Sequence, residues 1–357
     1  MYQWLQRLFF TPAPAAPPEP PPAPAPPAPA ARTAPGAAPG AAPGAAPGAV
    51  SFEQRDLVNG VYQRWLFENE TESGLDTSPA EQQVIEALDA ILASQQSGAA
   101  LVRRMPGLIP QLLQSLRSDT FSGAQLARTI SGDLVLVAAV IRLANNWIKG
   151  SGDSITSVEH AVMLIGHEGL RHLITSVAFR PIIDIHSGHY TRILAPRIWD
   201  QSERCAMANR MLAEAMGIDP FEAFLAGLVQ NAGLIVALRI MDQHTQDGAQ
   251  LGSELFCARL ASDARQLTCS IGREWNFPDS VTQAIGEQSG MKKGAPISPL
   301  GRLLTLSDYL GKLRILAEHH LLSAQDPALF KGLPPAALDC YRALDAMADE
   351  PAPAAQS

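Results

Sequence analysis

Histidines are the residues whose spacing in this sequence first suggests chemistry. The run HEGLRH at residues 167–172 is close to the H-E-x-x-H motif, which places two imidazoles on one helix face to hold zinc. Here His167 and His172 are five positions apart rather than four, which turns their side chains about 140° away from each other on a helix. The glycine between them also weakens that helix. We therefore expect no zinc site at this run.

The remaining histidines and the cysteines form no metal-binding pattern either. His319 and His320 are adjacent at the expected end of a helix, and adjacent helical side chains do not face each other. His186 and His189 flank a Ser-Gly pair in an expected surface loop, where weak metal binding is the minor alternative. No C-x-x-C pair occurs among the four cysteines, which are Cys205, Cys257, Cys269 and Cys340. Two of them lie in helical, apolar-looking segments typical of small core residues, which fits a reducing cytoplasm.

Composition and motif content exclude several function classes. The net charge of −8 and the pI near 5.5 argue against a general nucleic-acid binder, which would carry a basic stripe. The sequence contains neither G-x-x-x-x-G-K-[ST] nor G-x-G-x-x-G, so we expect no nucleotide cradle and no cofactor. The longest uninterrupted apolar run, residues 134–141, is far shorter than the roughly 20 residues of a spanning helix. We expect a cytoplasmic protein.

The two ends of the chain differ from its middle. Residues 1–10 form a short apolar tip, and residues 11–49 are almost wholly Pro, Ala and Gly. Such a linker cannot bury enough apolar surface to fold, so we expect it to be a disordered tether. The tip could touch a membrane surface or a protein groove, or it could simply be a frayed terminus. Residues 349–357 are expected to form a disordered tail.

Helical periodicity dominates the rest of the chain, and no segment alternates with a period of two. The sequence therefore predicts an all-α fold. The expected helices cover residues 51–69, 79–96, 111–118, 123–131, 134–146, 157–165, 169–179, 199–216, 221–241, 253–275, 280–288, 299–319 and 335–348.

Several short motifs recur in a characteristic order along these helices. They are MP…P at 105–110, GD at 132–133, RLAN at 142–145, ITSVEHA at 155–161, LIG at 164–166, WDQS at 199–202, FLAGLVQNAG at 224–233 and WNFP at 275–278. Each motif alone is weak, but their order and spacing resemble the HDOD family over residues 105–310. The resemblance implies an HDOD domain at 104–310, with helical extensions at 50–103 and 311–348.

The HDOD family is related to the HD superfamily of metal-dependent phosphohydrolases. In that superfamily an early His, an adjacent His-Asp pair and a later Asp hold a divalent metal, which activates water for attack on phosphorus. The resemblance places Gln201 at the early His and Gln230-Asn231 at the His-Asp pair. A tandem His-His would fall near Glu287-Gln288, and only Asp308 matches the later Asp.

The substitutions keep side-chain size and hydrogen bonding but remove the ligand nitrogen and most of the negative charge. An amide is a poor ligand for a transition metal, and one carboxylate cannot anchor a catalytic ion alone. We therefore expect no metal and no catalytic residue. The six positions could form a polar pocket for a small ligand, or the amides could merely satisfy one another in the core.

The resemblance implies a regulatory module in bacterial-type signal transduction that acts by binding a protein partner. Two alternatives stay open. The first is a divergent metal-dependent phosphohydrolase acting on a nucleotide or cyclic dinucleotide, which would need replacement ligands. The second is a metal-free sensor that binds a small molecule at Gln201, Gln230, Asn231, Glu287, Gln288 and Asp308.

Overall fold

The computed structural model describes residues 49–69, 76–94, 188–245, 249–289 and 295–347, with isolated positions at 141, 169, 171, 172, 175, 176 and 179. All regular elements in these ranges are helical, which confirms the all-α prediction. The expected apolar tip, most of the linker, the tail and the expected helices between 111 and 165 lie outside the described residues, as do His167 and His186.

The described helices are, in chain order, α2 (Phe52–Leu66), α3 (Pro79–Ala93), α8 (His189–Ala213), α9 (Pro220–Val229), α10 (Ala232–His244), α11 (Glu254–Glu274), α12 (Asp279–Glu287), α13 (Pro299–Glu318) and α14 (Pro335–Ala343). Short 3-10 turns follow at η2 (Glu214–Met216), η3 (Pro327–Phe330) and η4 (Leu344–Met347).

Side-chain caps explain why several helices begin where they do. The hydroxyls of Ser51 and Ser78 each accept a hydrogen bond from the backbone N–H three residues later. The side chain at that later position accepts a hydrogen bond from the backbone N–H of the serine, which completes a capping box. Asp219 caps α9 immediately before a proline at its first turn. Ser253 and Ser298 cap α11 and α13 in the same way.

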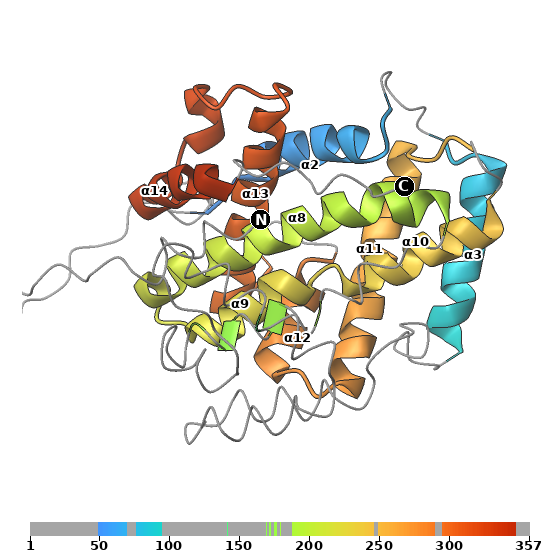
Figure 1. Ribbon diagram of the computed structural model, residues 1–357, viewed down its shortest axis with the longest axis horizontal. Coiled ribbons are helices and arrows are strands. Elements are labelled where there is room, and N and C mark those ends of the chain that lie inside the picture. The colour runs from blue at the N-terminus through green and yellow to red at the C-terminus, as the bar shows by residue number, and fades with distance from the viewer. Residues whose placement is uncertain are drawn as a thin grey trace, which may run out of the picture.

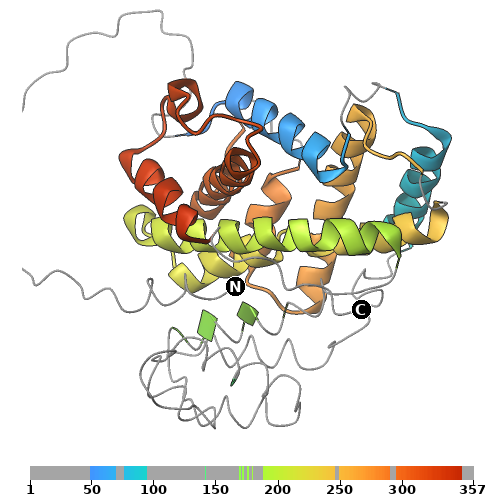
Figure 2. The same ribbon diagram turned by 45° about the horizontal axis from the view of Figure 1, so that its top comes forward.

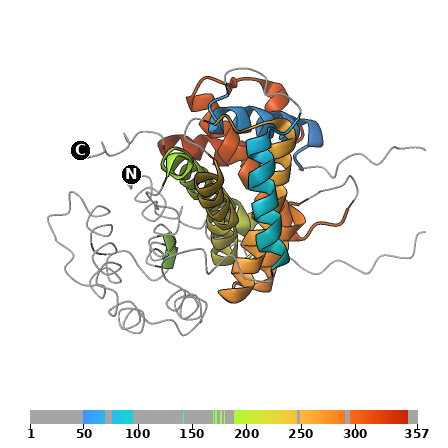
Figure 3. The same ribbon diagram turned by 90° about the vertical axis from the view of Figure 1, so that its right-hand side faces the viewer.

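Helix α8 crosses the middle of the molecule, with α9 and α13 packed against it (Figure 1). Helix α10 packs on α11, and α12 lies between α11 and α13. Helix α2 lies across α13 (Figure 2), and α3 runs beside α11 at one end of the molecule (Figure 3). The two N-terminal helices therefore cover α11 and α13 rather than standing apart.

One hydrophobic core unites these helices. Val58, Tyr62 and Leu66 of α2 and Val84 and Leu88 of α3 belong to the same buried cluster as the residues of α8 to α14. The region expected as an N-terminal helical extension thus packs directly on the part of the chain that carries the HDOD-like motifs.

Two expected helix boundaries are wrong. The helix expected at 199–216 begins at His189, because α8 continues through Pro196, and His189 is a helical residue rather than a loop residue. The helix expected at 221–241 is broken at Gln230 and Asn231 into α9 and α10. Residues 220–244 are long and apolar enough by composition to cross a membrane, but 78% of the apolar window is buried inside the protein.

Candidate functional site

Three residues from different helices meet at the break between α9 and α10. Gln201 lies in the middle of α8, Asn231 lies at the start of α10 and Asp308 lies in the middle of α13. Asn231 Nδ2 donates to Gln201 Oε1 at 2.5 Å and to Ser202 Oγ at 2.9 Å. Gln201 Nε2 donates in turn to Asp308 Oδ1 at 2.5 Å. The fold thus brings these three predicted site residues into one hydrogen-bonded chain.

Lys312 donates a hydrogen bond to the second carboxylate oxygen of Asp308. It lies one helical turn after Asp308 on α13, and its Nζ donates to Asp308 Oδ2 at 2.6 Å and to Asn59 Oδ1 of α2 at 2.9 Å. The ammonium also lies 5.4 Å from the centre of the Tyr62 ring. Sequence reasoning missed Lys312, although its spacing of four residues from Asp308 on a helix was a usable signal.

The backbone carbonyl of Gln230 holds this residue in position at the α9–α10 break. Its carbonyl oxygen accepts a hydrogen bond from Thr268 Oγ1 at 3.1 Å, and the same hydroxyl accepts from the backbone of Gly233. The side-chain amide of Gln230 lies within hydrogen-bonding reach of the buried Cys205 thiol.

Glu287 and Gln288 hold α12 to α13. Glu287 Oε2 accepts from the backbone and the hydroxyl of Ser298, at 3.0 and 2.7 Å. The Gln288 amide donates to the carbonyl of Gly301 at 3.1 Å and accepts from Thr305 at 2.9 Å. Glu287 and Gln288 therefore have a structural role, because their hydrogen bonds join the end of α12 to the start of α13.

A pocket of about 880 Å³ opens over this cluster. Helix α2 forms one wall and α11 forms the facing wall, while the α9–α10 break and α13 contribute the floor. Five of the six predicted residues line it, namely Gln201, Gln230, Asn231, Gln288 and Asp308. Glu287 does not. A volume of this size lies within the usual range for small-molecule sites.

The donor set does not fit the divalent metal that the HD relationship implies. Of the positions corresponding to the ligands, only Asp308 is a carboxylate, and the ammonium of Lys312 holds one of its oxygens. A cation there repels a metal ion, and the remaining amides are weak ligands. Within the described part of the chain, no cluster of three His, Cys, Asp or Glu side chains could replace them.

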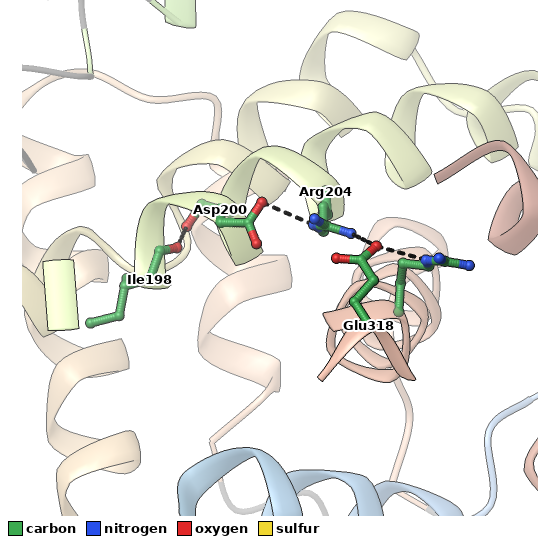
Figure 4. Close-up of polar contacts among 6 residues, drawn as sticks. Ile198, Asp200, Arg204 and Glu318 are labelled. Carbon is green, nitrogen blue, oxygen red and sulfur yellow. Dashed lines mark hydrogen bonds and ion pairs between the residues drawn. The ribbon is translucent and has the colours of Figure 1, made fainter. Parts of the chain in front are cut away.

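An ion network around the buried guanidinium of Arg204 joins α8 to α13 next to the pocket (Figure 4). Arg204 donates to Asp200 at 2.9 Å and to Glu318 at 2.7 Å, and Arg314 donates to the same Glu318 oxygen at 2.7 Å. Burial raises the pKa of Asp200, against the opposing attraction of Arg204. The network positions Gln201 and Asp308, which lie on the two helices that it joins.

The other histidines and the cysteines provide no second site in the described part of the chain. His172 packs edge-on against Phe224 with ring centroids 4.6 Å apart, and His319 packs against Trp65 at 4.9 Å. All four cysteines are buried and free. Burial raises the pKa of Cys257 and Cys340 to about 12, which keeps both thiols protonated and unreactive.

Comparison with known proteins assigns the fold to a family. The HDOD domain family matches residues 102–291, which is more than half of the chain. This chain belongs to the HDOD family. The recognition made from the motifs is therefore confirmed.

Similar proteins agree with this HDOD fold. An HDOD domain protein of unknown function from Geobacter sulfurreducens is 16% identical, with a TM-score of 0.51 over 71% of this chain and 89% of that one. A protein from Marinobacter aquaeolei VT8 whose proposed role is signal transduction is 17% identical, with a TM-score of 0.50 over 78% and 65%. An uncharacterized protein from Treponema pallidum is 19% identical over 193 residues, which span 52% of this chain and only 37% of that protein.

Proposed function

We propose that this HDOD domain is a non-catalytic regulatory module of cytoplasmic signal transduction, which acts by binding a protein partner. The observation that carries the proposal is that both carboxylate oxygens of Asp308 are hydrogen-bonded within the protein. These two oxygens are taken by the Gln201 amide and by the Lys312 ammonium. The carboxylate is thereby neutralised by the protein itself, at the position where an HD phosphohydrolase would use it to hold a metal.

The amide chain supports the same proposal. A phosphohydrolase needs an activated water, and activation requires either a Lewis acid or a general base near the reacting group. Asn231 and Gln201 supply neither, because an amide is not basic and each amide here is engaged by a neighbour. The arrangement fixes α8, α10 and α13 relative to one another instead.

Hydrolysis assays test the absence of catalysis. The full chain is incubated with Mn²⁺, Fe²⁺ or Mg²⁺ and a panel of nucleotides, cyclic dinucleotides and a chromogenic phosphodiester. The expected result is no turnover above that of the Asp308→Ala variant. Turnover that Asp308→Ala abolishes would overturn the proposal and favour the divergent phosphohydrolase.

A pull-down tests the protein partner. The full chain and a chain lacking residues 1–48 serve as baits, because a longer deletion would remove α2 from the core. A partner captured by both baits binds the folded part, and a partner captured only by the full chain binds the tip or the linker. Failure of both baits to retain any partner at stoichiometric amounts contradicts the proposal.

A further inference from the structure

The pocket contains a cation without a counter-ion. Arg265 of α11 lines the pocket and forms no hydrogen bond or ion pair with any other described residue. Burial lowers the pKa of Arg265, whereas the charge of Asp308 acts to raise it and that of Arg55 acts to lower it. Arg265 is half-buried, so its guanidinium stays accessible and can pair with an anion that enters the pocket.

The other charges of the pocket do not balance Arg265. The cationic lining residues are Arg55, Arg64, Arg265 and Lys312, and the acidic ones are Asp56, Glu254 and Asp308. Asp308 is already bound by Lys312, whereas Asp56 and Glu254 are exposed at the rim. Asp56 also pairs with Arg55 at 3.5 Å. The interior therefore keeps an excess of positive charge.

The two walls leave room for a ligand beside Arg265. Helix α11 faces the pocket with small side chains at helical spacing, namely Cys257, Ala258, Ala261 and Ala264. On the facing wall, Gly60 lies inside α2, and a Cβ atom there would meet no atom within 4 Å. A glycine inside a helix weakens it by about 0.5–1 kcal/mol relative to alanine, and here it leaves space open next to the pocket.

We infer that the pocket binds a small organic anion whose phosphate or carboxylate group pairs with Arg265. A guanidinium binds either group through two parallel hydrogen bonds. The Gln230 amide and the apolar side chains of Leu57, Phe67 and Leu260 line the same pocket and offer contacts for the remainder of the molecule. This inference rests on the proposed binding role, and it names the class of ligand that would act on it.

Calorimetric titration of the full chain with AMP and with citrate tests the inference, with adenosine as the uncharged control. AMP and citrate distinguish a phosphate ligand from a carboxylate ligand. At least one anion is expected to bind, and Arg265→Met is expected to weaken that binding roughly ten- to a hundredfold. Arg273→Met is the matched control, because Arg273 is exposed on the same helix and does not line the pocket.

One further variant and a folding control keep the test independent of folding defects. Ala261→Trp should block binding by filling the pocket while it leaves the charge of Arg265 in place. Without ligand, Arg265→Met and Arg273→Met should both keep a cooperative thermal transition, which shows that a loss of binding does not come from unfolding.

Two results would overturn the inference. The first is no binding of AMP or citrate up to about 10 mM, a concentration that detects millimolar affinity. The second is binding that survives Arg265→Met with undiminished affinity. Neither of these results bears on the hydrolysis assay, so a failure here is distinguishable from a failure of the proposed function.

Discussion

At the scale of single residues, Asp308 is the one carboxylate among the positions that the HD relationship suggests for metal ligands. It bridges the Lys312 ammonium and the Gln201 amide. Both side chains of the ion pair are largely buried, with exposed fractions of 13% for Lys312 and 20% for Asp308. At such burial each charge depends on the other for its stability.

Replacing Lys312 should therefore reveal strong coupling to Asp308. We expect Lys312→Met to lower the free energy of unfolding by about 1–3 kcal/mol, because it leaves Asp308 without its cation. Adding Asp308→Asn to that variant should recover much of the loss. Urea unfolding of both single variants and the double variant measures the coupling, and strictly additive effects would contradict the paired arrangement.

Glu81 is a second buried carboxylate with a defined role. Its oxygens accept from the backbone of Ser78, Gly252 and Ser253, each at 2.7 Å, and from the Ser253 hydroxyl at 2.8 Å. Burial acts to raise the pKa of Glu81, but these hydrogen bonds outweigh it and hold the pKa below its ordinary value. The carboxylate joins the first turn of α3 to the first turn of α11.

The lowered pKa of Glu81 predicts an acid-dependent loss of stability. Its contribution is fully present above the unfolded-state pKa of about 4.3 and is lost as the pH falls through the lower folded-state pKa. Glu81→Gln should cost about 2 kcal/mol at pH 7 and flatten the decline of stability below about pH 4. Glu86→Gln, on the exposed face of α3, is the control. A decline as steep as that of the native chain would exclude this role for Glu81.

Motif order was enough to predict that several polar residues lie together, but not which other residues they contact. Gln201, Asn231 and Asp308 were expected together and do meet. The contacts of Asn59 with Lys312 and of Glu81 with Gly252 join residues 253 and 171 positions apart in the chain. No local pattern encodes such distances, so Arg265, too, could not be assigned to a pocket before the fold was known.

At the scale of the helices, a close crossing of α8 and α9 fixes the floor of the pocket. Gly227 of α9 lies against the backbone of α8, and a Cβ atom there would fall 2.6 Å from both Cα and N of Ala206. Gly60 of α2 is also a glycine inside a helix, but its surroundings are open. The two positions form a natural pair for comparison.

Alanine at these two glycines should have opposite effects. Gly227→Ala should destabilise the protein by about 1–3 kcal/mol, because α8 and α9 must separate to admit the methyl group. Gly60→Ala should stabilise it by about 0.5–1 kcal/mol through helix propensity. Thermal unfolding of both variants measures the difference, and equal shifts in melting temperature would show that the crossing is not close.

Helix boundaries were predictable where a cap marks them. The starts of α11 and α13, which Ser253 and Ser298 cap, fall within one residue of the expected positions, at Glu254 and Pro299. The expected start at residue 199 falls inside α8, because the long helix begins at His189 and continues through Pro196. The break at Gln230-Asn231 was missed because the apolar periodicity of residues 221–241 continues through it.

At the scale of the whole molecule, α2 and α3 are integral to the fold. Helix α2 places Val58, Tyr62 and Leu66 in the core, ties Asn59 to Lys312 and forms a wall of the pocket. The family match begins only at residue 102. The pocket is therefore completed by a helix that precedes the matched region.

Two truncations separate the N-terminal segment from the folded part. Removal of residues 1–48 retains Ser51 and its cap and should leave the melting temperature unchanged within about 2 °C. Removal of residues 1–75 takes away three buried side chains, and it should cost about 5 kcal/mol or more. Circular dichroism melts compare the two, and equal stability of both truncated chains would show that α2 is dispensable.

Metal analysis of the purified full chain after incubation with Mn²⁺, Fe²⁺ and Zn²⁺ tests the central claim most directly. The matched variant restores the expected ligands through Gln201→His, Gln230→His and Asn231→Asp, and frees Asp308 through Lys312→Met. We predict far less than one metal ion per native chain and uptake of about one ion by the restored variant. One tightly held ion per native chain would contradict the account.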